Sequence, residues 1–460
     1  MNENSNLNNF LDKMRALRTF VNSVEPILMG KIESNLRENK RSFQPFFKML
    51  KIDPETNAIT IDEEQKKLFE EKYGMKWTDN GNKKTLELKP GALTDDFTRA
   101  IEHFKLTHDQ IEMLYQNSLM NLITYFETVI SGLIKEHLTR QGDFKNKSLT
   151  FEQISQLGNL DEAKEFLLEK EVHDLMYKGF DVWILYIKKN LKLSMGYLDP
   201  VKDQLIEIFQ RRNLFTHNNG VANNIYISRI APQYAKNTTV GSKIVISKTY
   251  LEESINLIEN MGNLILLENW KKKEPKNEKR AFYIGELLDE HFKCERWELV
   301  KSYSRFLMGD KGLPQSSQLV GQVNYWQSFK WLNQFNEVKE DVMNADFSAN
   351  RGDFQLCLLA LQDKEKEFFS LLNKSYPSYI SLEKLKNWPI FKEMRKIERI
   401  KTFIKNAEHK EERKTKSIKE QTEEAIKQFE KLDKEVDEVI NKNKEKDQDK
   451  SNIFNKDRLI

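Results

Sequence analysis

Helix-breaking residues are scarce throughout this chain. Its 460 residues include 10 prolines and 17 glycines, whereas charged residues make up 32% and hydrophobic residues 39%. Proline and glycine are the residues that an α-helix tolerates least, so their scarcity leaves long stretches free to become helical. A chain of this length also exceeds what one hydrophobic core usually organises. We therefore expect a mainly α-helical protein built from two or three domains.

Changes in hydrophobic spacing and in charge divide the chain into four predicted regions. The first is an N-terminal helix with a small strand-bearing insert, the second a helical domain, the third a set of helical hairpins and the fourth a charged helical tail. Their bounds are 1–99, 100–270, 281–405 and 406–460. The Lys-rich stretch 271–280 separates the two central domains, because Pro275 interrupts its run of solvated residues.

The N-terminal region shows two different periodicities. A helix over residues 1–40 would carry one apolar stripe, formed by Phe10, Leu11, Met14, Leu17 and Phe20. Residues 58–61 and 85–88 instead alternate between apolar and polar side chains, and the turn-forming residues 79–82 precede the second run. This alternation predicts short β-strands.

Start signals for helices recur in the second region. Helical periodicity returns after residues 93–96 and holds to about 139, and Thr107 with Gln110 have the spacing of a capping box before Ile111. Thr150 with Gln153 form a second predicted capping box, which opens the next helix. Further helices are predicted over 160–176, 178–193 and 251–267.

A further helix is predicted just before the middle of the chain. Asp199 and Pro200 suit its first turn, and the apolar spacing that follows carries it into residues 212–217. Two β-prone runs, 223–227 and 242–246, come next and predict a small β-hairpin inserted between this helix and the following one.

The third region contains paired helices with aromatic stripes. One stripe comprises Tyr325, Trp326, Phe329, Leu332, Phe335 and Val338, and a second comprises Phe354, Cys357, Leu358 and Leu361. Residues 362–364 interrupt the second pattern before it resumes at Phe368. Such hairpins loosely resemble tetratricopeptide-like solenoid units, although no fixed repeat period is visible. An ordinary helical bundle fits the pattern equally well.

The charged tail carries a regular apolar pattern. Its members are separated alternately by four and three residues, and they are Ile418, Thr422, Ala425, Phe429, Leu432, Val436 and Val439. This spacing is typical of a left-handed coiled coil and is sustained for about three heptads. The tail either associates with itself or forms an isolated or intramolecular helix.

Charge and cysteine content limit the classes of function. Lys and Arg number 74 against 71 acidic residues, so any contact with nucleic acid must be local. Cys294 and Cys357 are far apart in the sequence, which favours a reducing, cytoplasmic setting. His291 and Cys294 alone do not make a zinc site, and no metal is expected. No signal-peptide pattern is visible, and no apolar run approaches the roughly 18 residues of a membrane span, so no membrane association is expected.

The run Arg212-Asn213-Leu214-Phe215-Thr216-His217 resembles the motif of HEPN-type ribonucleases, and this resemblance makes its residues the catalytic candidates. A ribonuclease that uses no metal must deprotonate a ribose 2′-hydroxyl, protonate the leaving 5′-oxygen and stabilise the charge that develops on phosphorus. Histidine titrates near neutrality, and arginine offers a permanently charged planar fork for phosphate oxygens. We therefore assign acid–base catalysis to His217 and phosphate binding to Arg212. Alternatively, both side chains tie a helix end to its neighbours.

An arginine, a polar residue, three further residues and a histidine are the signature of the HEPN superfamily. The chain resembles a subgroup of bacterial HEPN proteins over roughly 100–267, including the continuation 218–223 and the upstream residues 124–127. The resemblance implies a HEPN-type helical bundle, a homodimer that pairs two copies of the motif, and products with a 2′,3′-cyclic phosphate and a 5′-hydroxyl. It implies no cofactor. It also implies a role in bacterial antiviral defence or toxin-like RNA restriction.

Other residues of the second region are candidates for supporting roles. Asn213 would orient the motif by hydrogen bonding, and Glu127 would position or modulate the basic pair, although a glutamate within a helix is more often only solvated. A local surface for RNA phosphates could be formed by Arg211, Lys188, Lys189, Lys192 and Arg229. Lysines scattered over helices are, however, usually solubilising.

Helix geometry places a condition on the motif. In an ideal helix, Arg212 and His217 would be separated by about 140° around the axis and roughly 7.5 Å along it. They would therefore not converge on one phosphate if the helix ran straight through both. We expect the helix to end near His217, because residues 218–220 are suitable C-cap residues, and the freed imidazole would then turn toward Arg212.

The leading hypothesis is a metal-independent endoribonuclease that acts on RNA as a homodimer. The third region would sense a protein or nucleotide trigger. One alternative is a catalytically inactive HEPN scaffold that binds RNA, a nucleotide or a protein partner through the same residues. Another is a structural adaptor that binds its partner through residues 281–405.

Overall fold

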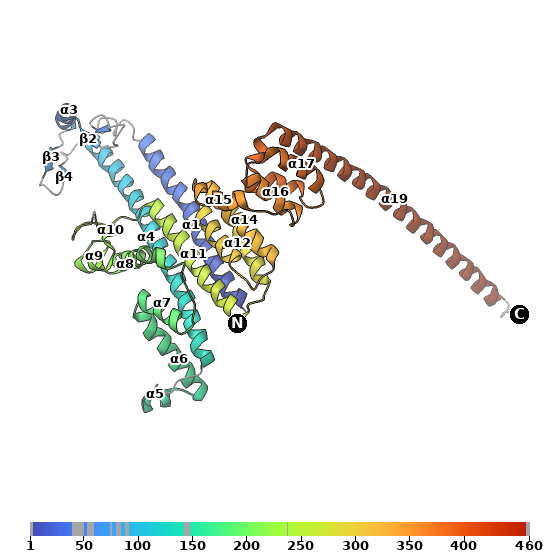
Figure 1. Ribbon diagram of the computed structural model, residues 1–460, viewed down its shortest axis with the longest axis horizontal. Coiled ribbons are helices and arrows are strands. Elements are labelled where there is room, and N and C mark those ends of the chain that lie inside the picture. The colour runs from blue at the N-terminus through green and yellow to red at the C-terminus, as the bar shows by residue number, and fades with distance from the viewer. Residues whose placement is uncertain are drawn as a thin grey trace. The chain divides into compact units, whose positions relative to one another are not determined.

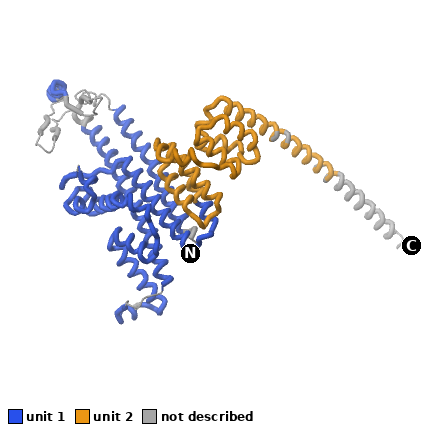
Figure 2. Tube along the Cα trace, in the orientation of Figure 1, with its two compact units in different colours: residues 1–283 blue, residues 284–460 orange. Residues whose placement is uncertain are grey.

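The computed structural model describes residues 3–38, 50–52, 59–73, 76–79, 84–87, 92–141, 148–236 and 238–456. The chain is mainly helical, as its composition predicted, and it divides into two compact units, 1–283 and 284–460 (Figure 2). The division falls inside helix α12 (Lys279–Lys293). None of the described helices is long and apolar enough to cross a membrane.

Three long helices form the centre of unit 1. Helices α1 (Glu3–Glu38), α4 (Ala92–Gln141) and α11 (Lys248–Lys273) lie side by side (Figure 1). Their apolar faces form a common core, and α11 in particular is buried over most of its length. This bundle is the frame against which the shorter helices of the unit pack.

The apolar stripe predicted for α1 is buried, with one exception. Phe20 is exposed, and Val21 is buried in its place. Because a helix advances by about 3.6 residues per turn, the stripe that passes through Leu17 continues at Val21 rather than at Phe20. Arg18, on the flank of this stripe, donates a hydrogen bond of 3.0 Å to the buried carboxylate of Glu259 on α11.

The described residues between α1 and α4 form four short strands and one helix. Strand β1 (Leu50–Ile52) pairs with β2 (Ile59–Ile61), and β3 (Lys76–Asp79) pairs with β4 (Lys84–Glu87), both antiparallel. Helix α3 (Glu63–Tyr73) separates the two pairs. Strands β2 and β4 fall where alternation predicted them, whereas the predicted turn residues 80–82 lie outside the described residues.

Helix α4 does not begin at the first predicted capping box. It runs unbroken from Ala92 through Thr107 to Gln141. The Thr107 hydroxyl donates to the carbonyl oxygen of His103 at 2.9 Å, which is a bond to the preceding helical turn and not a cap. The cap predicted at Thr107 is wrong, because a capping box forms only where its first residue lies outside the helix and Thr107 lies within α4. The helical periodicity predicted up to about residue 139 is confirmed.

The second predicted capping box is confirmed. The backbone N–H of Gln153 donates to the Thr150 hydroxyl at 3.2 Å, and the N–H of Thr150 donates to the Gln153 side chain at 3.0 Å. The helices that follow are α5 (Phe151–Gln156), α6 (Leu160–Tyr177), α7 (Phe180–Lys189), the 3-10 turn η1 (Asp199–Val201) and α8 (Lys202–Asn218).

The hairpin predicted over 223–227 and 242–246 is wrong. Residues 224–229 form helix α9 (Asn224–Arg229), because the Asn223 side chain accepts a 2.8 Å hydrogen bond from the N–H of Tyr226 and caps a helix there. A short α10 (Pro232–Ala235) follows. The segment 242–244 pairs instead with 220–222, through a single antiparallel bridge between Val221 and Lys243.

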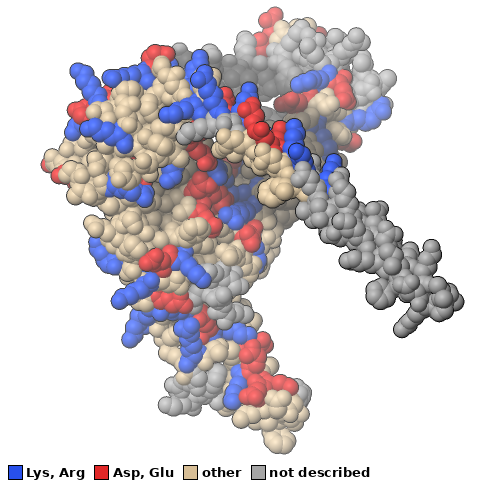
Figure 3. All heavy atoms as spheres, turned by 90° about the vertical axis from the view of Figure 1, so that its right-hand side faces the viewer, with Lys and Arg blue, Asp and Glu red and all other residues tan. Residues whose placement is uncertain are grey.

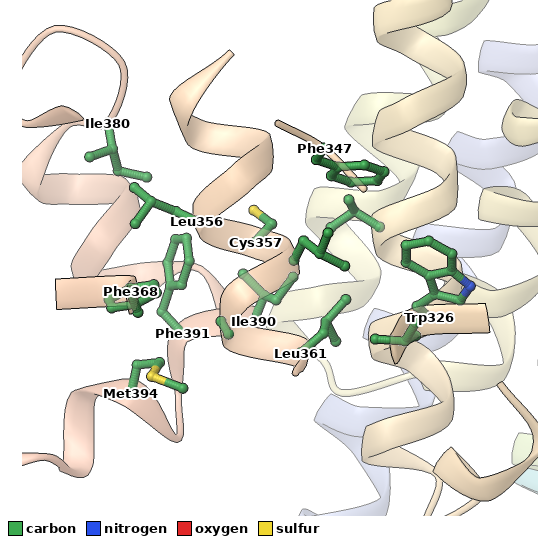
Figure 4. Packing of buried hydrophobic residues seen from close by; sticks show 14 of the residues in the cluster. Trp326, Phe347, Leu356, Cys357, Leu361, Phe368, Ile380, Ile390, Phe391 and Met394 are labelled. Atoms are coloured by element: carbon green, nitrogen blue, oxygen red, sulfur yellow. The ribbon is translucent and has the colours of Figure 1, made fainter. Parts of the chain in front are cut away.

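Unit 2 is a succession of short helices followed by a long one. The short elements are α13 (Trp297–Met308), α14 (Gln315–Trp331), η2 (Phe335–Glu337), α15 (Lys339–Asn344), α16 (Gly352–Leu361), α17 (Glu365–Ser375), α18 (Leu382–Asn387), η3 (Pro389–Phe391) and η4 (Met394–Lys396). The long helix is α19 (Glu398–Lys456). Both predicted aromatic stripes contribute to one core, which Figure 4 shows around Trp326, Cys357 and Phe391.

Helices α13 and α14 form a tight hairpin at the start of unit 2. A Cβ atom at Gly321 of α14 would lie 2.5 Å from the backbone nitrogen of Met308 and 2.8 Å from the carbonyl oxygen of Ser304, both on α13. These neighbours are backbone atoms and have little freedom to move, so glycine is required for the close approach of the two helices.

Candidate active site

An aromatic cluster fixes α8, the helix that carries the candidate catalytic residues. The Phe209 ring on α8 lies 4.8 Å from that of Phe180 and 5.7 Å from that of Trp183, both on α7. The Phe209 ring also contacts Phe126 of α4 edge to face, at 5.9 Å between centroids. Such contacts add to the burial of large apolar surfaces. They hold α8 against α4 and α7, one turn before Arg212.

Helix α8 ends one residue beyond His217, as the predicted C-cap residues indicated. Asn219 adopts the left-handed conformation with φ of 49°, and Gly220 follows with φ of 74°. The N–H of Gly220 donates to the Leu214 carbonyl at 3.3 Å. A Cβ atom at Gly220 would lie 2.5 Å from the Phe215 ring, so a larger residue would not fit without moving this ring.

The expected turn of His217 toward Arg212 does not occur. Both residues lie within the same continuous helix, which includes His217 in its last turn. Helical geometry therefore keeps them about 140° apart around the axis and roughly 7.5 Å apart along it. The C-cap residue, Asn219, lies beyond His217, so the end of the helix does not change the direction of the His217 side chain. Within one chain, the two side chains do not face one phosphate.

Arg212 pairs with Glu127 of α4. One Nη atom of its guanidinium donates to the Glu127 carboxylate, and about a quarter of each side chain is exposed, 24% and 26%. The Nε atom of Arg212 is buried and has no hydrogen-bond partner among the described residues. The structure thus joins two candidates that are 85 residues apart in the sequence. A phosphate that bound Arg212 would compete with a carboxylate for the guanidinium.

Asn213 and His217 lie on a different face of α8. They are four residues apart, so their side chains are neighbours on the helix surface. Asn213 is half-buried and His217 is exposed. In the described part of the chain, neither side chain makes a hydrogen bond or an ion pair. Both are therefore available to a substrate or to a second protein chain.

Arg211 belongs to a buried network instead. Its Nε donates to the Glu207 carboxylate at 2.7 Å, and its guanidinium lies 3.8 Å from the centre of the Tyr250 ring. The hydroxyls of Tyr226 and Tyr250 donate to the same carboxylate, each at 2.7 Å. Glu207 is almost fully buried. The arginine expected to contact RNA thus has its guanidinium engaged by a buried carboxylate.

This network was not predicted from the sequence. Glu207 and Arg211 are spaced as helix neighbours, which gave a weak signal, but the tyrosines come from α9 and α11. Burial, together with the adjacent Glu207 carboxylate, raises the pKa of the Tyr226 and Tyr250 hydroxyls. Both phenols therefore stay protonated and continue to donate to the carboxylate. The network holds α9 and α11 onto α8 just before the motif.

The remaining basic candidates are spread over several elements. Lys188 on α7 forms an ion pair of 3.0 Å with Asp199. Lys189 at the end of α7, Lys192 in the following loop and Arg229 on α9 are exposed. Basic and acidic side chains are interspersed on the face of the molecule seen in Figure 3. Among the candidates themselves, Lys188 is paired with a carboxylate, whereas Lys189, Lys192 and Arg229 carry exposed charges.

Metal-ligating side chains do not cluster in the described residues, where no group of three or more His, Cys, Asp or Glu could hold an ion. His291 is buried and Cys294 is exposed, both near the end of α12. No protein-family model matches the chain, and no curated protein or solved structure is significantly similar to it.

Proposed function

We propose that the protein is a HEPN-type endoribonuclease that cleaves RNA without a metal and acts as a homodimer. The observation that carries the proposal is the arrangement of α8, which holds Arg212 against Glu127, leaves His217 exposed and leaves Asn213 half-buried beside it. These are the residue types that phosphate binding and proton transfer need. The aromatic cluster and the Glu207 network keep the helix that carries them rigid.

The division of labour follows from the chemistry of each group. His217 accepts the proton of the ribose 2′-hydroxyl, whose oxygen then attacks phosphorus, and a protonated histidine delivers a proton to the departing 5′-oxygen. Arg212 stabilises the negative charge on the phosphate oxygens during this exchange. Asn213, beside His217 on the helix surface, orients the substrate or the imidazole by hydrogen bonding. The products carry a 2′,3′-cyclic phosphate and a 5′-hydroxyl.

Two copies of α8 supply what one copy does not. Arg212 and His217 diverge on a continuous helix, so the reacting phosphate needs its arginine and its histidine from different chains. A two-fold symmetric pair of α8 helices provides both combinations at once, since each chain gives the same residues to the other. The half-buried Asn213 and the exposed His217 then lie where the second chain approaches.

The test is cleavage of a labelled single-stranded RNA in EDTA. We expect the wild-type protein to cleave, and His217→Ala and Arg212→Ala each to lower the rate by at least about 100-fold, the usual contribution of a positioned acid–base group. Fragments should accept a 5′-phosphate from polynucleotide kinase without prior phosphatase treatment. His173→Ala is the matched control, because His173 is an exposed histidine on α6. Equal rates in all four proteins would exclude the proposed site.

One observation favours a second candidate function. The Arg212 guanidinium is neutralised by Glu127 and points away from His217, which suits a protein that binds RNA through this helix without cutting it. Such a scaffold would bind the labelled RNA, would lose affinity on Arg212→Ala and would leave the RNA intact in every variant. Binding without cleavage by the wild-type protein would therefore select this candidate.

A further inference from the structure

Helix α19 leaves the rest of unit 2 after its first turns. Its start is buried at Ile400 and Ala407, and the Tyr376 hydroxyl donates to Glu411 at 2.8 Å. From Glu411 to Lys434, every side chain that the structure describes is exposed. Figure 2 shows this part as a single helix that continues away from the clustered helices of its unit. The helix thus has no core of its own there.

Large apolar side chains lie on this exposed stretch. Phe429 is 73% exposed, Ile418 61% and Leu432 56%. Isolated helices in water are only marginally stable, and an apolar residue on such a helix gains nothing until a surface covers it. Most of the other residues of the stretch are charged, with basic and acidic side chains interspersed, which keeps it soluble. The apolar residues therefore need a partner.

The spacing of these residues indicates what the partner is. Ile418, Ala425 and Leu432 are seven residues apart, and Thr422 and Phe429 interleave with them as the other half of an a/d pattern. The sequence continues this rhythm at Val436 and Val439. A strict seven-residue repeat drifts around a straight helix, so it fits a second supercoiled helix with the same repeat better than a fixed apolar surface.

We propose that residues 418–439 form a coiled coil with the same segment of a second copy of this chain. A second copy of the chain carries the same seven-residue repeat, so the pairing requires no other protein. The positions that flank the stripe include Lys419, Gln421 and Gln428, so two copies meet without a block of like charges. Ile426, which is 52% exposed, lies next to Ala425 and widens the apolar contact where the stripe has its smallest residue.

The coiled coil also has a consequence for the active site, and this consequence rests on the proposed function. Two chains joined at their tails stay together, which raises the effective concentration of one α8 helix near the other. Pairing of two α8 helices then becomes an event within one complex. The tail would thereby supply the dimer that the divergent Arg212 and His217 require.

Sedimentation equilibrium of the full chain tests the coiled coil directly. We expect the wild-type protein to approach twice its monomer mass of 54.5 kDa as concentration rises. The double variant Phe429→Glu with Leu432→Glu should sediment as a monomer, because two carboxylates would face two others across the seam. The matched control is Lys427→Glu with Lys434→Glu, which adds the same residues off the stripe and should still dimerise. Circular dichroism should show that both variants still fold, with the double variant losing at most the helix of its unpaired tail.

The results separate this inference from the proposed function. A wild-type monomer at every concentration, or a double variant that still dimerises with the wild-type affinity, overturns the coiled coil whatever the protein does to RNA. A second arm replaces residues 418–439 of the full chain by an unrelated two-stranded coiled coil. We expect this replaced chain to sediment as a dimer, unlike the double variant. It should cleave RNA only if the ribonuclease proposal also holds. Dimer mass without any cleavage in wild type would reject the function and keep the coiled coil.

Discussion

The ion pair between Arg212 and Glu127 controls how readily the guanidinium can bind a phosphate. Glu127→Gln removes the competing charge and keeps the size of the side chain. An ion pair that is partly open to solvent contributes about 0.2–1 kcal/mol, so RNA binding should strengthen by roughly 1.4- to fivefold. Fluorescence anisotropy in a His217→Ala background measures this without cleavage.

The control for this prediction is Glu102→Gln, which makes the same change of net charge at an exposed position of α4. An equal gain in affinity in that variant would mean that overall charge and not the pair with Arg212 had been measured. Weaker binding in Glu127→Gln would indicate instead that the carboxylate positions the arginine for RNA.

The buried carboxylate of Glu207 depends on its hydroxyl donors. Tyr226→Phe removes one of them and should lower the free energy of unfolding by about 1–3 kcal/mol in urea denaturation at neutral pH. Tyr177→Phe, at an exposed position, should change it by less than about 0.5 kcal/mol. If both variants were equally stable, Glu207 would not rely on this hydrogen bond.

The same tyrosine gives a dependence on alkaline pH. Burial and Glu207 raise the folded-state pKa of Tyr226 above its ordinary value of 10.0. A raised pKa means that the stabilisation is fully present below pH 10 and is lost as the pH rises toward the folded-state pKa. The stability difference between wild type and Tyr226→Phe should therefore be constant up to about pH 10 and should shrink above it. A difference that grew above pH 10 would contradict this assignment.

At the scale of elements, the end of α8 depends on Gly220. Gly220→Ala puts a Cβ atom into a left-handed residue and against the Phe215 ring, so we expect a loss of about 2 kcal/mol in the free energy of unfolding. Gly132→Ala in α4 is the control, because nothing lies within 4 Å of its added Cβ and alanine favours a helix. Thermal denaturation should give opposite signs for the two variants, and equal signs would contradict the role of the left-handed cap.

Local signals predicted those elements that local interactions decide. The capping box at Thr150 and the stop after His217 each need only a few neighbouring residues, and both are present. The β-prone run at 225–227 became a helix because Asn223 caps it and because Tyr226 reaches Glu207 on another helix. Contacts of this second kind join residues far apart in the sequence, so periodicity alone does not reveal them.

The candidate site shows the same division between local and distant information. The sequence identified Arg212 and His217 as candidates from their residue types and predicted where α8 ends. Both predictions rest on one short run of residues. It gave Glu127 only a general modulating role, since nothing in either run indicates that α4 and α8 cross at that point. It also assumed that a nearby C-cap would turn the imidazole, whereas the helix includes His217 before the cap begins.

At the scale of the whole molecule, two features make dimerisation the decisive step for the proposed ribonuclease. One is the near-neutral net charge, and the other is that Arg212 and His217 point in different directions from α8. Lys and Arg exceed Asp and Glu by the formal charge of +3, so overall attraction adds little to RNA binding. The contribution of each chain must then come from its few placed residues. If one phosphate meets Arg212 of one chain and His217 of the other, inactive variants should complement each other.

Mixing Arg212→Ala protein with His217→Ala protein tests this sharing of residues. In a mixed dimer, one of the two sites receives an intact arginine from one chain and an intact histidine from the other, whereas its twin receives neither. Random exchange puts about half of the chains in mixed dimers, each with one working site of two, so activity should recover to about a quarter of the wild-type value. The exchange is completed by dilution and reconcentration, and mass measurement of differently tagged chains confirms it. Continued inactivity after complete exchange would mean that each phosphate uses both residues of a single chain, and α8 would then have to unwind near His217 during catalysis.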